Sequence, residues 1–247
     1  MAKEFKLEIE CSDLAVEVWF NDLPVFFQNG GMRTKNAIIN QWLIDGRNRV
    51  EIKLKAIEKI DPVEVNAHLN LNLMDNQINL FSYAWKPGDT KKNLPQFTNG
   101  GFVLGMEFGQ WVWQQAEILE LNEMLFREVN RYLQGVYESL NSGNIIETMN
   151  IFRVKAEEQA RAYGMAIDTR ITEQRRFFES WFSETGWRMQ PIDYNSLEYT
   201  LCGDKRIIQL NKNDGSNVLQ SVPVSSGEMI SFPLFITKFN GNWLVIR

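Results

Sequence analysis

Residues 230–247 read ISFPLFITKFNGNWLVIR, and this stretch decides the fold of the second half of the chain. Two apolar runs, PLFITKF and NWLVIR, flank Asn240 and Gly241. Both central residues of a type I′ turn need positive φ, and Asn-Gly meets that need better than any other common pair. The stretch therefore predicts a β-hairpin.

Working back from this hairpin, LEYTLC, RIIQL and VLQSVPV also alternate like strands, with turn signals at Gly203-Asp204 and Asn213-Gly215. Helical periodicity precedes them, because apolar residues recur every three or four positions. The residues in this stripe are Ile118, Leu121, Leu125, Val129, Leu133, Val136 and Leu140. Helices followed by an antiparallel sheet predict an α+β domain with helices packed on a curved sheet.

Two further helices are expected before the strands. IIETMNIFRVKAEEQARAYG is one, with Glu157 and Arg161 at ion-pair spacing. ITEQRRFFESWFSETG is the other, with Asp168 or Thr172 as its N-cap and Gly186 at its end.

The first hundred residues have the period of strands instead. In FKLEIE, Phe5, Leu7 and Ile9 alternate with charged residues. LAVEVWF and VFF flank a turn at Asn21-Asp22, NQWLIDGRNRVEIKLKAI turns at Asp45-Gly46, and HLNLNLMDNQINLFSYAW repeats the pattern. Strands at this spacing predict an all-β sandwich.

The stretch KPGDTKKNLPQFTNGG, residues 86–101, is rich in proline, glycine and lysine, which is typical of a loop or linker. We therefore expect two domains, a β-sandwich over 1–100 and an α+β domain over 101–247.

Both halves resemble known superfamilies. REVNRYLQGVYESLNSGNIIETMNIF and the closing hairpin resemble the NTF2-like, cystatin-like superfamily, whose sheet wraps around a cone that holds ligands in some members. The helical segment Val154–Ser183 departs from that pattern. VEVWFNDLPVFF and INQWLIDGRNRVEIKL resemble the accessory β-sandwich domains, immunoglobulin-like or jelly-roll, of bacterial proteins and glycosidases.

Net charge and the distribution of apolar residues limit the classes of partner that we expect. A formal net charge of -5 and a pI near 5.2 argue against a nucleic-acid partner. No segment has the apolar length of a membrane span, and the start MAKEFKLEIE lacks a secretory apolar run, so we expect no membrane association and a cytoplasmic location.

The residues that usually carry chemistry are scarce. His68 is the single histidine and lies in the first half, so the usual carboxylate-histidine pair of NTF2-like enzymes is missing. Cys11 and Cys202 are expected to be buried apolar residues, and their distance is left open. Phosphate-loop, dinucleotide and nucleophile-elbow motifs are absent from the sequence, and we expect no metal and no cofactor.

Two sets of residues are candidates for binding. The first is a partner-binding surface on the third predicted helix, where arginines and aromatics crowd together: Arg170, Arg175, Arg176 and Trp181. The second is a ligand set for the expected cone, comprising Asp193, Tyr194 and Glu198.

Two functions follow from these candidates. One is a non-catalytic protein that binds another protein, with an immunity protein that neutralises a toxin as the narrower hypothesis. The alternative is a protein that binds a sugar or another small molecule, or a carboxylate-driven enzyme, using the cone of the second domain.

Overall fold

A computed structural model describes residues 3–58, 61–63, 65–88 and 94–247. The chain forms two compact units, Met1–Gln110 and Trp111–Arg247, called here the N-terminal and C-terminal units. The division falls after Gln110 instead of at residue 100. The reason is that Gln96–Leu104, expected in part as a linker, is strand β8 and pairs with β5, Gly46–Ala56. Of the expected linker, residues 89–93 lie outside the described part.

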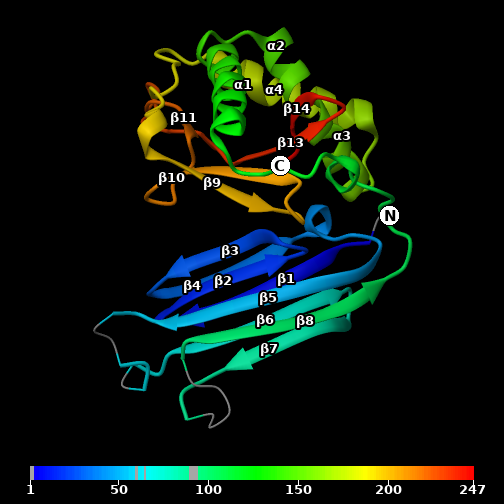
Figure 1. Ribbon diagram of the computed structural model, residues 1–247, viewed down its shortest axis with the longest axis vertical. Coiled ribbons are helices and arrows are strands. Elements are labelled where there is room, and N and C mark those ends of the chain that lie inside the picture. Colours follow the sequence, from blue (N-terminus) through cyan, green and yellow to red (C-terminus); the bar gives the residue numbers. More distant parts are fainter. Residues whose placement is uncertain (1–2, 59–60, 64, 89–93) are drawn as a thin grey trace. The chain divides into compact units, whose positions relative to one another are not determined.

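The N-terminal unit contains two four-stranded antiparallel sheets (Figure 1). The first has the order β4-β1-β6-β7, and the second has the order β3-β2-β5-β8. Their remaining bounds are β1 Phe5–Ser12, β2 Leu14–Phe20, β3 Leu23–Asn29, β4 Met32–Ile38, β6 His68–Asp75 and β7 Ile78–Trp85.

The expected alternation is confirmed in β1, where Phe5, Leu7 and Ile9 are buried. The buried faces of the two sheets meet, since the Cys11 thiol of β1 donates to Oε1 of Gln28 in β3 at 3.2 Å. The β2–β3 turn is also confirmed, because Asn21 and Asp22 both have positive φ.

Two local predictions in this unit were wrong. β4 was not foreseen, because its sequence, MRTKNAI, lacks alternating apolar residues and the strand lies at a sheet edge. The residues before Asp45-Gly46 form the 3-10 turn η1, Asn40–Trp42, instead of a strand. Buried Asn40 explains this turn, since its Oδ1 accepts from Phe5 N at 2.8 Å and its Nδ2 donates to the Lys3 carbonyl.

The C-terminal unit holds α-helices, a four-stranded antiparallel sheet of order β14-β13-β10-β9 and the two-stranded sheet β11-β12 (Figure 1). The helices in the described part are α1 Glu123–Asn141, α2 Ile145–Ile151, α3 Arg153–Ala162 and α4 Ile167–Phe182. The strands are β9 Leu197–Cys202, β10 Ile207–Lys212, β11 Leu219–Gln220, β12 Ser231–Phe232, β13 Leu234–Phe239 and β14 Asn242–Val245. Two 3-10 turns, η2 Val112–Gln115 and η3 Tyr194–Ser196, complete this unit's elements in that part.

The apolar stripe of α1 packs on one face of the larger sheet. Val129 and Leu133 share one buried cluster with Leu210 of β10 and Ile236 of β13. The predicted hairpin is confirmed as β13–β14, with positive φ at Asn240 and Gly241.

The helix boundaries differ from the predicted ones. α1 begins at Glu123, because Asn122 caps it by accepting from Leu125 N at 2.9 Å. Ile118 and Leu121 therefore lie outside the helix and are exposed. The helix predicted next divides into α2 and α3 at Phe152, whose ψ of 8° leaves the helical range.

The capping prediction for α4 was also wrong. The helix starts at Ile167, before Thr172, and follows Ala166, which makes no side-chain cap bond. Asp168 lies in its first turn, where a negative charge suits the helix dipole.

Candidate functional site

The predicted partner-binding residues all lie on α4, and one of them, Arg170, lines a cavity. Arg170 is half-buried, and its Nε and Nη2 donate to Gln159 Oε1 at 3.1 and 2.6 Å. Arg175 and Arg176 are exposed, while the Trp181 ring is partly covered. α4 therefore presents an outward arginine pair and turns Arg170 toward α3.

Several arginines of this region are paired within the chain. Arg175 lies 3.7 Å from Glu179, and Arg153 donates to Glu157 at 2.7 Å. Glu157, predicted to face Arg161, thus pairs with Arg153 instead. Exposed pairs one helical turn apart contribute only a few tenths of a kcal/mol.

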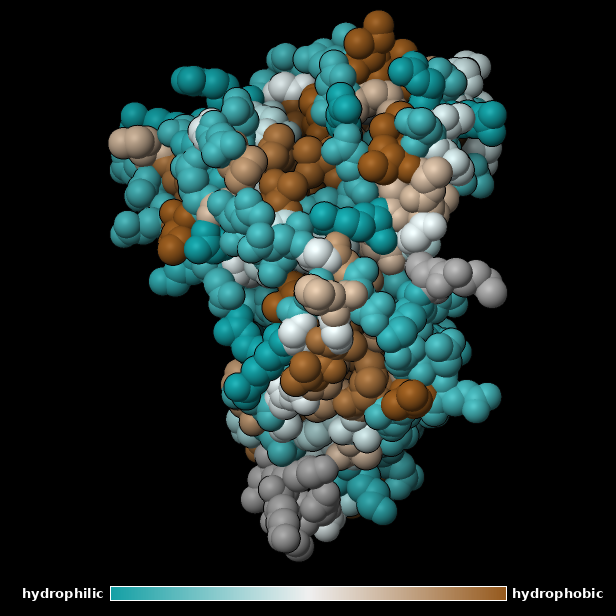
Figure 2. Space-filling model, turned by 90° about the vertical axis from the view of Figure 1, so that its right-hand side faces the viewer, coloured by the Kyte–Doolittle hydropathy of each residue, from teal (hydrophilic) through white to brown (hydrophobic). Residues whose placement is uncertain are grey.

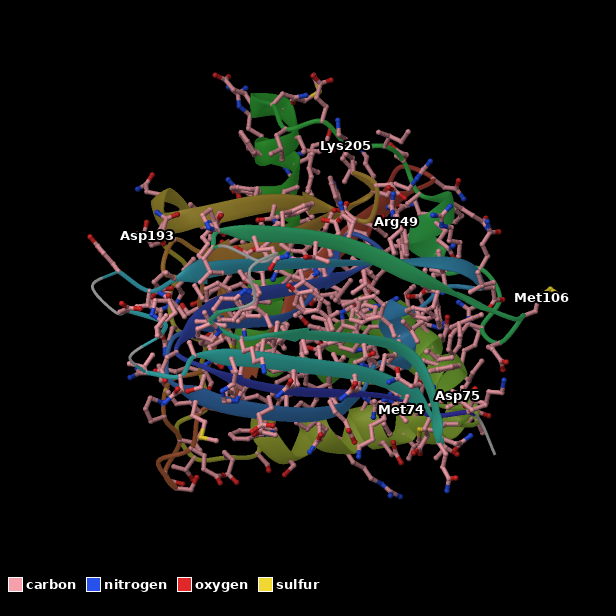
Figure 3. The ribbon with its side chains drawn as sticks, turned by 90° about the horizontal axis from the view of Figure 1, so that it is seen from below. Arg49, Met74, Asp75, Met106, Asp193 and Lys205 are labelled. Carbon is pink, nitrogen blue, oxygen red and sulfur yellow. The ribbon has the colours of Figure 1, made fainter. Side chains whose placement is uncertain are left out.

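The predicted cone residues do not converge on a cavity. Asp193 and Glu198 are exposed, and Asp193 Oδ1 accepts from Asn195 N in a local cap. Asp193 is labelled in Figure 3. Tyr194 donates its hydroxyl to Oε1 of Gln134 in α1 at 2.5 Å. The space between α1 and the sheet is filled by the shared apolar cluster, with Tyr194 packed against it.

A cavity of about 450 Å³ lies elsewhere, between α3, α4 and the β12 region. Its apolar lining is rich in phenylalanine and consists of Phe152, Phe177, Phe178, Ile230, Phe232 and Pro233. Its polar lining consists of Lys155, Gln159, Arg170, Glu173, Gln174 and Ser231. We call this cavity the α3–α4 pocket.

Close packing of α3 against α4 positions the polar residues that each helix contributes to the pocket. Ala156 and Ala160 of α3 are fully buried, so their small side chains allow α4 to approach. Gln174 of α4 donates its amide to the Phe152 carbonyl at 3.3 Å, and the same carbonyl accepts from Ala156 N of α3 at 3.1 Å. The pocket therefore has a wall from each helix.

The apolar wall is an aromatic cluster. The ring centroids of Phe178 and Phe232 are 5.9 Å apart in stacked geometry, and those of Phe152 and Phe178 are 5.4 Å apart. Phe177 contacts Phe232 edge-on at 6.5 Å and is 43% exposed. Such rings offer a flat apolar ligand offset or edge contacts.

The polar wall carries an excess of positive charge. Lys155 and Arg170 are its cations, and Glu173 is its carboxylate. Glu173 is about half exposed and lies 3.4 Å from Arg170. Burial, and then the positive charges of Arg247 and Arg170, lower the pKa of Lys155 to about 8. An anion in the pocket would relieve that repulsion.

A second carboxylate nearby is already engaged. Glu158 is buried, and its Oε2 accepts from Arg247 Nη1 at 2.6 Å while its Oε1 accepts from Val112 N at 2.7 Å. Arg161 and Arg247 also lie over the fully buried ring of Trp111, at 4.4 and 5.3 Å from its centroid. This cluster anchors the start of the C-terminal unit. The Glu158 carboxylate already forms an ion pair with Arg247.

Sequence reasoning singled out Arg170 but missed Lys155. Lys155 stands in the charged run RVKAEEQARA, which is typical of a solvated helix. The available signal was the pair Ala156 and Ala160, whose spacing permits close packing of another helix beside Lys155 and Gln159. Nothing in the sequence indicates that β12 completes the wall.

The other chemical candidates lie outside this pocket. His68 opens β6, with Nδ1 3.3 Å from the Asn66 carbonyl and Nε2 3.7 Å from the Glu10 carboxylate. Cys11 and Cys202 are buried and lie in different units. The described residues contain no group of three or more His, Cys, Asp or Glu suited to a metal ion. Among them, no helix combines the length and the apolar character that crossing a bilayer requires.

Comparison with known proteins finds no relative of this chain. No protein-family model matches it, and neither the curated proteins nor the solved structures contain a match.

Proposed function

We propose that the protein binds a small organic anion with an apolar body in the α3–α4 pocket. The observation that carries the proposal is that Lys155 and Arg170 line one pocket together with the aromatic pair Phe178 and Phe232. Natural ligand pockets combine mostly apolar walls with a few orienting polar groups. A volume of about 450 Å³ suits a ligand with an aromatic or short aliphatic body.

The positive charges of Lys155 and Arg170 favour an acid over a neutral compound as the ligand. A carboxylate can accept two parallel hydrogen bonds from a guanidinium. Gln159 already fixes the plane of the Arg170 guanidinium, because its Oε1 accepts from Nε and Nη2. A neutral ligand of the same shape would add no negative charge to offset the repulsion between Lys155 and Arg170.

Calorimetry with matched ligands tests this proposal. Phenylacetate is expected to bind more tightly than phenylacetamide, which has the same shape without the charge. Arg170→Gln is expected to weaken phenylacetate binding by roughly tenfold or more, as loss of a charged hydrogen bond predicts. Arg176→Gln, on the exposed side of the same helix, is the matched control. Equal affinity for acid and amide would refute the proposal.

A protein partner is the second candidate, as a non-catalytic cytoplasmic binding protein of the immunity type. It is favoured by the exposure of three consecutive residues of α4, Arg175, Arg176 and Phe177. Figure 2 shows apolar side chains reaching the surface among hydrophilic ones. A pull-down with the tagged chain tests it, and the double variant Arg175→Glu, Arg176→Glu should lose a stoichiometric partner. Capture that is unaffected by this charge reversal would argue against this surface.

We also propose an NTF2-like topology for the C-terminal unit and an accessory β-sandwich for the N-terminal unit. Helices on one face of a sheet that ends in a hairpin support the first. Two four-stranded sheets with buried facing sides support the second. An experimental structure with a strand order foreign to these superfamilies would contradict the assignment.

A further inference from the structure

The ε-amine of Lys155 lines the α3–α4 pocket in an unusual setting for a lysine. Its Nζ lies over an aromatic face, 5.8 Å from the Phe152 ring centroid. Within the described residues, no carboxylate forms an ion pair with it and no acceptor forms a hydrogen bond with it. The amine is therefore available to a ligand.

Burial, and then the positive charges of Arg247 and Arg170, lower the pKa of this amine and so favour its neutral form. From α4, Arg170 and Glu173 face the pocket, and Arg247 and Tyr163 lie close by. Glu158 of α3 is committed to Arg247, and the residues that line the β12 side carry no charge. With a pKa of about 8, roughly a fifth of the amine is neutral at pH 7.4, against about 0.1% for an ordinary lysine.

We propose that Lys155 forms an imine with oxo acids that enter this pocket, so that the ligand class is an oxo acid with an apolar body. The inference rests on the proposed anion-binding function. Arg170 would hold the carboxylate, the phenylalanine wall would hold the body, and the amine would meet the carbonyl carbon.

The step balances without an oxidant or reductant. The neutral amine attacks the carbonyl carbon and forms a C–N bond, and a proton passes from nitrogen to oxygen to give a carbinolamine. The C–O bond then breaks, one water leaves, and the imine remains. The reaction reverses when water returns, so the pocket captures its ligand reversibly.

Reductive trapping on the full chain tests the proposal. Phenylpyruvate and cyanoborohydride are added at pH 7.5, and intact mass is measured. One adduct is expected, heavier than the protein by the mass of phenylpyruvate less one oxygen atom. Peptide mapping should place it on Lys155, with roughly tenfold or more label over the exposed Lys205. Label spread evenly over exposed lysines would overturn the proposal.

Two further measurements distinguish failure of the imine proposal from failure of the anion-binding proposal. Lys155→Arg keeps the positive charge but has no nucleophilic amine, so it should lose the adduct. Phenylacetate should also compete with trapping on the unmodified chain. Binding of phenylacetate without any adduct would overturn the imine and leave the anion-binding function standing. Absence of both would overturn the two together.

Discussion

Replacing Lys155 by methionine should stabilise the C-terminal unit at neutral pH. Folding lowers the pKa of Lys155 from its ordinary value of 10.5 to about 8, because the charged form is disfavoured by burial and by Arg247 and Arg170. That difference corresponds to at most about 3 kcal/mol. Because the side chain is only half-buried, we expect a gain of about 1–3 kcal/mol for Lys155→Met at pH 7.

The gain should depend on pH in a defined direction. Between pH 8 and 10.5 the unfolded chain binds more protons at this lysine than the folded chain does, so the stability of the unmodified protein rises with pH. Below pH 8 the full penalty is present. The advantage of Lys155→Met should therefore shrink to less than about 1 kcal/mol at pH 10.

Urea unfolding followed by far-ultraviolet circular dichroism measures this difference. All the α-helices of the described residues belong to the C-terminal unit, so the helical signal reports that unit. Arg176→Met is the matched control, because Arg176 is exposed on α4 and arginine keeps its charge over this pH range. A Lys155→Met protein that is less stable at pH 7, or whose advantage is the same at both pH values, would refute the reasoning.

Three other changes have defined effects on the free energy of unfolding, measured in the same assay or by thermal unfolding. Glu158→Gln should cost about 3 kcal/mol, because it leaves Arg247 buried without its counter-charge; a loss below about 1 kcal/mol would contradict this. Gly101→Ala should destabilise the N-terminal unit by roughly 2 kcal/mol or more, since its Cβ would lie 2.5 Å from the Asn48 carbonyl oxygen; wild-type stability would refute the packing. Gly135→Ala in α1 should stabilise by about 0.5–1 kcal/mol, because a Cβ there meets nothing within 4 Å; destabilisation would show a contact unaccounted for.

Most of the individual elements could be predicted because their signals are local. Alternation in FKLEIE needs only one solvated face, and Asn240-Gly241 needs only its own backbone angles. The α1 stripe likewise reflects one helix against one sheet. The errors arose where a side chain from a distant segment decides a boundary, as Asn40 does when it binds the backbone of Phe5 and turns the chain before β5.

The candidate site was predictable only in part. The sequence marked Arg170 only as one of several arginines. In the structure Arg170 contacts Gln159 of α3 and Arg175 is exposed, because α3 covers one face of α4 only. The cone residues were chosen from a resemblance, and Asp193 and Glu198 proved to be exposed.

By itself, the sequence determined the strand-rich first half, the helices and hairpin of the second, and the scarcity of histidine and cysteine. These depend on periodicity, turn chemistry and composition, which are properties of short segments. Only the tertiary structure decided that Lys155, Arg170 and Phe232 line one pocket. The reason is physical: a lysine's pKa and its access to a ligand depend on which charges and apolar groups exclude water from it, and those groups come from three separate segments of the chain.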